Sequence, residues 1–216
     1  MALEKGTIVA TALRLLDEGG LDKLTLRRLA GELGVQAPAL YWHFGSKQDL
    51  LDAMAAQMMR ERPAPPVFTD PARWRAWVAA RARNDRAMLN ARRDGARLAA
   101  GTRPSAELFA EVERAVAALE SAGFTAEEAM LGLSAVSGYV AGFVLEEQAD
   151  RARDDAEGPP DREAFARAYP RLMAALERIG DPQGDEAFEG GLALILDGLE
   201  RRLASRDSAG LPGPAE

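Results

Sequence analysis

Few residues in this chain of 216 could carry out bond-making chemistry. It has no cysteine and a single histidine, His43. Disulfides, thiolate nucleophiles and cysteine-based zinc sites are therefore excluded, and one imidazole is too few for a histidine metal cluster. There is no glycine-rich phosphate loop, and a Ser-His-Asp triad would have to use His43. The sequence predicts a protein that is not an enzyme and that binds no metal or cofactor.

The clearest functional pattern surrounds that histidine, in TLRRLAGELGVQAPALYWHF at residues 25–44. Apolar residues at helical spacing predict two short helices joined at Gly34, with Pro38 in the first turn of the second. Such a second helix can project side chains into the major groove of DNA while the first helix braces it. Two short helices around a glycine also occur in ordinary bundles, so the pattern alone leaves both interpretations open. The side chains expected to face outward or pack at the edge are Gln36, Ala37, Ala39, Tyr41, Trp42 and His43.

The residue identities extend this interpretation. The stretch LTLRRLAGELGVQAPALYWHFGSKQDLLDAM (24–54) resembles the DNA-binding domain of the tetracycline-repressor (TetR) family, most specifically in LYWHFGSKQDLL (40–51). RRDGARLAAGTRP (92–104), LSAVSGYVAGFVLEEQ (133–148) and GGLALILDGLERRL (190–203) resemble the ligand-binding body of its tetracycline-type branch. The resemblance implies a homodimeric, ligand-responsive repressor that a small-molecule effector releases from a palindromic operator in double-stranded DNA.

The same resemblance indicates which residues contact DNA. The base-contacting positions of the family fall on Arg27, Gln36 and Ala37, and arginine and glutamine suit guanine and adenine edges. The phosphate-contacting positions fall on Thr25, Tyr41, His43 and Lys47, which position the domain without reading sequence. Ala37 and Ala39 replace a glutamine and a hydroxyl residue of the tetracycline-type pattern, so we expect an altered operator. Without its context Arg27 would be an ordinary surface arginine and His43 merely exposed, whereas Trp42 is expected to be mainly structural.

The resemblance also places the effector contacts. Pro63 and Ala115 match two further contact positions of the tetracycline-type set. The main predicted ligand-binding residues are Arg81, Asp85, Ala99, Thr102, Arg103, Pro104, Val112, Met130, Leu133, Ser137 and Glu146.

Some of these positions depart from the tetracycline sensors. Ala99 stands where those proteins have a magnesium-binding histidine, and Pro63 and Arg81 stand where they have polar groups that grip the drug. Thr102 and Glu146 could still order water around an ion. We therefore predict an effector other than magnesium-tetracycline, either more apolar or anionic, with Arg81 a candidate partner for a negative charge.

The sequence predicts an all-α fold, because apolar residues recur at three- and four-residue spacing and no stretch alternates with period two for long. Prolines and glycines divide the chain into a helix-turn-helix domain (1–47), a connecting helix with a Pro-rich link (48–66), a larger helical ligand-binding and dimerisation domain (67–205) and a disordered tail (206–216). A mobile loop is expected at 150–160. The first four expected helices cover about 3–18, 26–33, 37–44 and 47–62. In the larger domain one helix starts at about 70, and the others cover about 105–122, 126–149, 162–179 and 185–205.

Two helices of the larger domain could form the dimer interface. Phe188, Leu192, Ile195, Leu196, Leu199 and Leu203 form an apolar stripe, and Gly132, Ser134, Gly138 and Gly142 would permit close helix approach. Packing within one chain explains both patterns equally well, but the resemblance favours a four-helix interface between subunits.

Charge and hydropathy fit a cytoplasmic regulator. The net charge of −7 is uneven, since residues 1–47 hold six basic and five acidic side chains, which suits a DNA-facing module on an acidic body. No run reaches the roughly 18 uninterrupted apolar residues of a membrane span. An all-helical small-molecule-binding dimer without DNA-binding activity remains the alternative.

Overall fold

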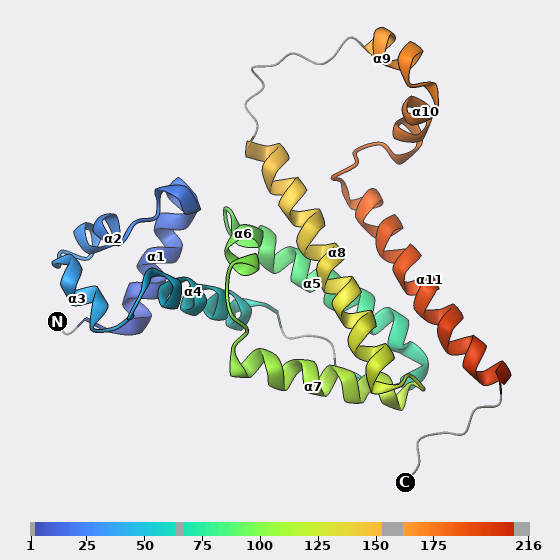
Figure 1. Ribbon diagram of the computed structural model, residues 1–216, viewed down its shortest axis with the longest axis horizontal. Helices are drawn as coiled ribbons and strands as arrows, with labels where there is room; N and C mark the ends of the chain where they lie inside the picture. Colours follow the sequence, from blue (N-terminus) through green and yellow to red (C-terminus); the bar gives the residue numbers. More distant parts are fainter. Residues whose placement is uncertain (1–2, 64–66, 153–161, 210–216) are drawn as a thin grey trace.

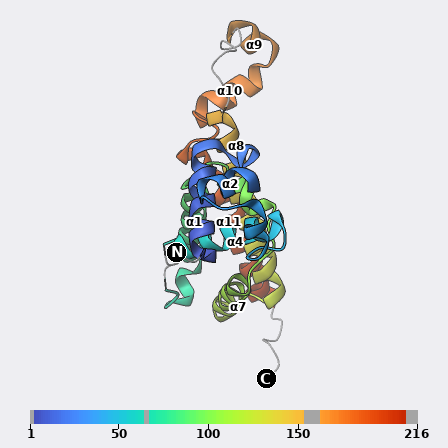
Figure 2. The same ribbon diagram turned by 90° about the vertical axis from the view of Figure 1, so that its left-hand side faces the viewer.

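The computed structural model describes residues 3–63, 67–152 and 162–209. Helices dominate these three segments and no strand occurs in them, which confirms the predicted all-α class. Figure 1 shows a small N-terminal group of helices at one end of the molecule and a larger body beside it. Figure 2, viewed from that end, places the N-terminal helices in front of the body.

The N-terminal group, here called the head, consists of α1 (Lys5–Gly19), the short helix η1 (Leu21–Lys23), α2 (Leu26–Glu32) and α3 (Ala37–Tyr41). Helix α1 buries Ile8, Ala12 and Leu16 completely, as the predicted stripe requires. It ends at Gly20, whose φ of 78° is readily adopted only by glycine.

The tight connection between α2 and α3 turns at Gly34, as predicted. Thr25 caps α2, its Oγ1 accepting a hydrogen bond of 3.1 Å from the amide of Arg28. Gly34 turns the chain with a φ of 67°. Leu29 and Leu40 are fully buried between the two helices and α1, so the head has its own apolar core.

Helix α4 (Lys47–Glu61) leads from the head into the body. Ser46 caps it, because its hydroxyl accepts a 3.1 Å hydrogen bond from the amide of Asp49. Its buried side chains Leu50, Met54 and Met58 recur every four residues. The helix packs first on α1 and then on body helices, so one rigid element contacts both parts.

The body is built around α8 (Ala126–Ala152), which packs against four other helices (Figure 1). Thr125 and Glu128 form a capping box at its start, with reciprocal hydrogen bonds of 3.0 and 3.1 Å. The partners of α8 are α5 (Trp74–Asn90), which follows η2 (Pro71–Arg73), α6 (Gly95–Ala100), α7 (Ala106–Ser121) and α11 (Asp185–Ala209).

By length and composition α8 could also cross a membrane, a property that core helices of soluble proteins share. Only 28% of its most apolar window is buried in the single chain, so much of its apolar surface faces outward.

Several predicted boundaries were wrong. Helix α6 was not predicted, and the helix expected at 162–179 is broken by Pro170, which lacks the amide needed to continue it, into α9 (Arg162–Ala168) and α10 (Pro170–Ile179). These two helices stand away from the rest of the body (Figures 1 and 2). Residues 150–152 continue α8, and α11 extends to Ala209, past the expected start of the disordered tail. The rest of the predicted loop, and the tail from 210, lie outside the described residues.

Candidate nucleic-acid interface and effector cavity

The residues predicted to contact DNA come from three neighbouring places in the head: the start of α2, all of α3, and the start of α4. All of them keep some solvent exposure, so the head presents them on its surface. Exposed are Thr25, Arg27, Gln36, Tyr41 and Lys47, and half-buried are Ala37, Ala39 and His43.

Two adjacent arginines on α2 differ in what they contact. The guanidinium of Arg28 lies 3.3 Å from the carboxylate of Glu18 on α1, so it helps to hold the head together. Arg27 is exposed, and among the residues that the structure describes it has no hydrogen bond or ion pair. Its full set of donors is therefore available to an external acceptor.

Trp42 corrects an expectation. We predicted a mainly structural role in packing, but its side chain is 90% exposed and the neighbouring Tyr41 is 54% exposed. The sequence could not show this, because α3 ends at Tyr41 and no described helix covers the turn that follows. The side chains of Tyr41 and Trp42 therefore both lie on the surface of the head.

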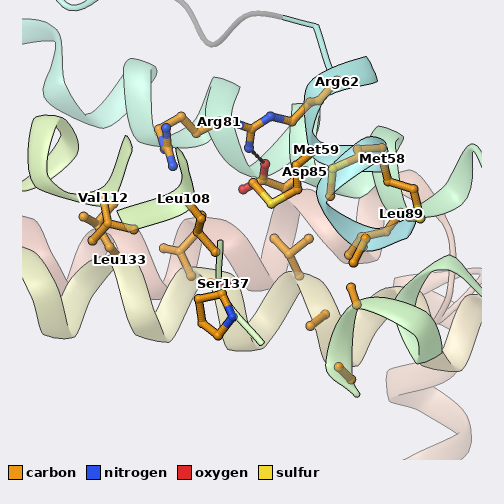
Figure 3. A pocket seen from close by; sticks show the side chains of 18 of the residues that line it. Met58, Met59, Arg62, Arg81, Asp85, Leu89, Leu108, Val112, Leu133 and Ser137 are labelled. Carbon is orange, nitrogen blue, oxygen red and sulfur yellow. Dashed lines mark hydrogen bonds and ion pairs between the residues drawn. The ribbon is translucent and has the colours of Figure 1, made fainter. Parts of the chain in front are cut away.

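The body encloses a cavity of about 520 Å³ between α4, α5, α7 and α8 and the segment 99–105 (Figure 3). Ten of the eleven predicted ligand-binding residues line it. They are Arg81, Asp85, Ala99, Thr102, Arg103, Pro104, Val112, Met130, Leu133 and Ser137.

Three residues suggested by the resemblance do not line the cavity of this chain. Glu146 is exposed on α8, beyond the last lining residue, Ala141. Pro63 is exposed after the end of α4, and Ala115 is buried in α7 but not among the lining residues. A single chain therefore does not bring these three side chains to the site.

Sequence reasoning missed other lining residues. Met58, Met59, Met88, Leu89 and Leu108 make much of the wall apolar. Their helical spacing was visible, but a stripe of this kind usually indicates core packing and could not distinguish a cavity from a filled core.

One wall of the cavity is charged. Arg62, the residue that follows α4, pairs with Asp85 of α5 and donates a 2.6 Å hydrogen bond to Glu111 of α7. Arg81 of α5 donates a 2.7 Å hydrogen bond to the other oxygen of Glu111. Figure 3 shows Arg62 and Arg81 on the same side of the cavity, opposite Leu133 and Ser137. We call Arg62, Arg81, Asp85 and Glu111 the charge cluster.

The two carboxyls of the charge cluster are perturbed in opposite directions. Burial raises the pKa of Asp85 above its ordinary value, and this effect exceeds the opposing attraction of Arg62. Burial would also raise the pKa of Glu111, but hydrogen bonds from Arg62 and Arg81 outweigh it and the pKa is lowered. Glu111 is thus the firmly ionised member of the pair.

The segment 92–104 connects the cavity to the head. Arg92 lies 2.6 Å from Asp17 on α1, and the amide of Leu21 donates a 2.7 Å hydrogen bond to Asp94. Asp94 has a left-handed backbone with a φ of 56°. Gly95 follows it, and a Cβ there would lie 2.2 Å from the carbonyl oxygen of Leu89. This crowded turn begins α6, and the residues after α6 line the cavity.

The body also has an uncovered face on α8 and α11. Leu131 is 58% exposed and Leu194 72% exposed. A Cβ added at Gly138, Gly142, Gly190 or Gly198 would meet no atom of the described residues within 4 Å. By contrast, Phe188, Leu192 and Leu196 of the predicted interface stripe are buried within the chain, so intramolecular packing explains that part of the pattern.

A helix-turn-helix head joined by one helix to a helical body with a cavity defines the class of ligand-binding transcription regulators. Residues 8–54 match the family described as bacterial regulatory proteins, tetR family, and residues 67–203 match the tetracyclin repressor-like C-terminal domain. The chain therefore belongs to the TetR family of transcriptional repressors.

Similar proteins cover nearly the whole chain. The tetracycline repressor protein class C of Escherichia coli is 42% identical over 95% of this chain and 94% of its own length. TetR from Acinetobacter baumannii AYE, solved in complex with minocycline, is 40% identical with a TM-score of 0.72, over 94% of this chain and 99% of that one. The Streptomyces coelicolor TetR family protein ActR, solved in complex with actinorhodin, is 31% identical with a TM-score of 0.80 over the same shares.

Proposed function

We propose that this protein is a cytoplasmic, homodimeric repressor that a small-molecule effector other than magnesium-tetracycline releases from a palindromic operator. The observation that carries this proposal is the segment 92–104, which contacts the head at one end and lines the cavity at the other. Occupancy of the cavity can therefore be transmitted to the DNA-binding surface through contiguous contacts.

In this proposal Arg27 and Gln36 read base edges, and Ala37 and Ala39 change the preference from that of the tetracycline repressors. Thr25, Tyr41, His43 and Lys47 contact phosphates. The support is their common exposure on the head and the unpaired state of Arg27 within the described residues. An arginine with a free guanidinium can donate two hydrogen bonds to one guanine.

The chemistry of the cavity supports an effector other than a metal chelate. Ala99 offers only a methyl group to the cavity, and the described residues include no group of three His, Cys, Asp or Glu that could hold a metal ion. Most lining side chains are apolar, and three of the charged ones, Arg62, Arg81 and Asp85, belong to the charge cluster. A molecule with a largely apolar body and one polar edge fits this distribution.

A second copy of this chain is the proposed partner of the uncovered face on α8 and α11. Leu131 and Leu194 provide apolar area, and the open glycines allow helices to approach closely. A two-fold axis through this face would place two heads on one side of the dimer, and a palindromic operator has the same symmetry.

Release follows if the effector shifts α4 and so changes the distance between the two recognition helices. Helix α4 lines the cavity with Ala55, Met58 and Met59 and packs on α1 of the head. An operator affinity that is the same with and without a tightly bound effector would contradict this mechanism.

The decisive experiment measures binding of the purified protein, by fluorescence anisotropy, to DNA from upstream of its own gene and to palindromes selected from random DNA. We expect specific binding that weakens steeply with salt. A thermal-shift screen that includes minocycline and actinorhodin, followed by DNA release, identifies effectors. A stable dimer that binds small molecules but shows no salt-sensitive DNA binding would instead establish the alternative function.

A further inference from the structure

Arg62 occupies an unusual place for a charged residue. It directly follows α4, its side chain is 5% exposed, and its guanidinium contacts carboxylates from two body helices. Because both partners lie in the body, these contacts fix the end of the connecting helix to the wall of the cavity. No other arginine described between 48 and 63 is buried, since Arg60 is 50% exposed.

The charge cluster holds two arginines and two carboxylates, so it is internally balanced. Glu111 binds one arginine with each oxygen, whereas Asp85 accepts a hydrogen bond from Arg62. Arg81 uses one nitrogen for Glu111 and stacks 5.4 Å from the ring of Trp77. Its remaining donors can serve a ligand, and Figure 3 shows it directed toward Val112 and Leu108 inside the cavity.

We propose that Arg62 is the positioning residue that couples the cavity to α4, and that the cavity binds molecules with an apolar body and one acidic group that competes with Glu111 and Asp85 for the two arginines. This inference rests on the proposed function, because it names the effector class and the transmission step of the same cavity.

The charges favour an acid over a base. Arg62, Arg81 and Arg103 line the cavity, against a single lining carboxylate, Asp85. Even with Glu111 counted, the positive side chains outnumber the negative ones by three to two, and an acidic group can form charge-assisted, two-pronged hydrogen bonds with an arginine. Binding an acid leaves three negative groups for two arginines, and Asp85, which has the fewest contacts, is the one displaced.

Displacement of Asp85 has a direct consequence for α4. Arg62 then keeps only Glu111, so its ion pair with α5 is lost while its ion pair with α7 remains. The last turn of α4 becomes free to move relative to α5. The end of α4 thus has two arrangements, one with the Arg62–Asp85 ion pair and one without it. Because α4 leads into the head, a change between these arrangements can couple the cavity to the DNA-binding surface.

The ligand chemistry can be tested with two probes that share one ring system. 1-Anilinonaphthalene-8-sulfonate carries an acidic group, and N-phenyl-1-naphthylamine lacks it; both fluoresce on entering apolar sites. With the full-length protein we expect the sulfonate to bind about tenfold to a hundredfold more tightly. Arg81→Gln should remove that preference and leave the affinity for the neutral probe unchanged.

The coupling can be tested by hydrogen exchange of the amides at 58–62. In the wild type we expect the sulfonate probe to accelerate exchange there and the neutral probe to leave it unchanged. In Arg62→Gln exchange should already be fast and insensitive to the sulfonate. Arg60→Gln is the matched control, because Arg60 also joins α4 to α7, through an exposed 3.7 Å pair with Glu107, and it should behave as the wild type.

Glu111→Gln protects the test against a variant that misfolds, since it preserves the shape of the side chain and keeps one of its two acceptor atoms. It removes the negative charge that holds the two arginines and should tighten sulfonate binding. Equal affinity for the two probes, failure of both to bind, or unchanged exchange at 58–62 with saturating sulfonate would each overturn the proposal. Operator affinity measured without any probe tests DNA binding by itself, so a failure of the proposed function is distinguishable from a failure of this inference.

Discussion

The amide of Leu21 donates a 2.7 Å hydrogen bond to the carboxylate of Asp94, which joins the head to the turn between α5 and α6. Asp94 also holds a left-handed backbone, with a φ of 56°, and lies 3.4 Å from Arg97. Aspartate suits this position because it tolerates that backbone better than most residues and accepts hydrogen bonds with a charged group.

Replacing Asp94 by alanine should therefore lower the free energy of unfolding by about 2–4 kcal/mol, from the lost charged hydrogen bond and the left-handed backbone together. Asp94→Gly loses the same hydrogen bond without the backbone strain, and should be about 1 kcal/mol less destabilised than the alanine variant. Asp94→Asn keeps an acceptor oxygen but loses the charge, so it should be less destabilised than the alanine variant. Urea unfolding measures all three, and an alanine variant as stable as the wild type would show that the carboxylate does not hold Leu21.

Glu147 gives a prediction about pH. It is 5% exposed, accepts hydrogen bonds of 2.7 and 3.1 Å from Arg86, and accepts another of 2.8 Å from Asn90. Burial alone would raise the pKa of Glu147, but the bonds from Arg86 and Asn90 outweigh it and the pKa is lowered.

A lowered folded-state pKa stabilises the fold above the unfolded pKa of glutamate, about 4.3, and this stabilisation disappears as pH falls through the folded value. Glu147→Gln should thus cost about 1.5–3 kcal/mol at pH 7, and progressively less below pH of about 4.5. Urea unfolding across that range measures the difference. Glu200→Gln, which removes an exposed 3.2 Å pair with Arg75, is the control and should cost less than about 1 kcal/mol at any pH. A constant difference across the range would contradict the assignment to the ionised carboxylate.

The fold was predictable wherever local chemistry determines it. The caps at Thr25 and Ser46 and the capping box at Thr125 each depend on residues three apart, so local sequence is enough to form them. Helix α6 escaped prediction because it is only six residues long and its start depends on the backbone of Asp94 and the tight approach of Gly95 to Leu89.

The cavity was predictable in outline only. The resemblance named ten residues that line the cavity, but it could not indicate the charge cluster. Arg62 is 23 residues from Asp85 and 49 from Glu111, and their meeting depends on how α4, α5 and α7 cross. For this reason Arg81, expected to be free for a ligand, was found to be partly engaged by Glu111. The exposure of Trp42 likewise depends on tertiary neighbours that no local pattern reveals.

Two neighbouring arginines provide a test of base reading. Arg27→Ala should weaken operator binding by about 1–3 kcal/mol and relax the preference at one base pair. Arg28→Ala is the matched control, because Arg28 pairs with Glu18 inside the head, and it should leave the base preference intact.

Lys47→Ala should weaken binding to all sequences alike and reduce the salt dependence by about one phosphate contact. Anisotropy titrations on operator variants at several salt concentrations measure these effects. If the base preference survives in Arg27→Ala, Arg27 does not contact a base.

The exposed face on α8 and α11 provides a test of assembly. Leu194→Glu and Leu131→Glu place a charge where each wild-type side chain is mostly exposed, so neither should unfold the single chain. If two copies meet through this face, the buried and unpaired carboxylates should dissociate the dimer, with a loss of several kcal/mol in association free energy. Val67→Glu, at an apolar residue 83% exposed elsewhere, is the control and should leave the dimer intact. Sedimentation equilibrium gives the masses, and circular dichroism checks the helix content. If the protein remains dimeric in both variants, the dimer interface lies elsewhere. The operator affinity of both variants should then also equal that of the wild type.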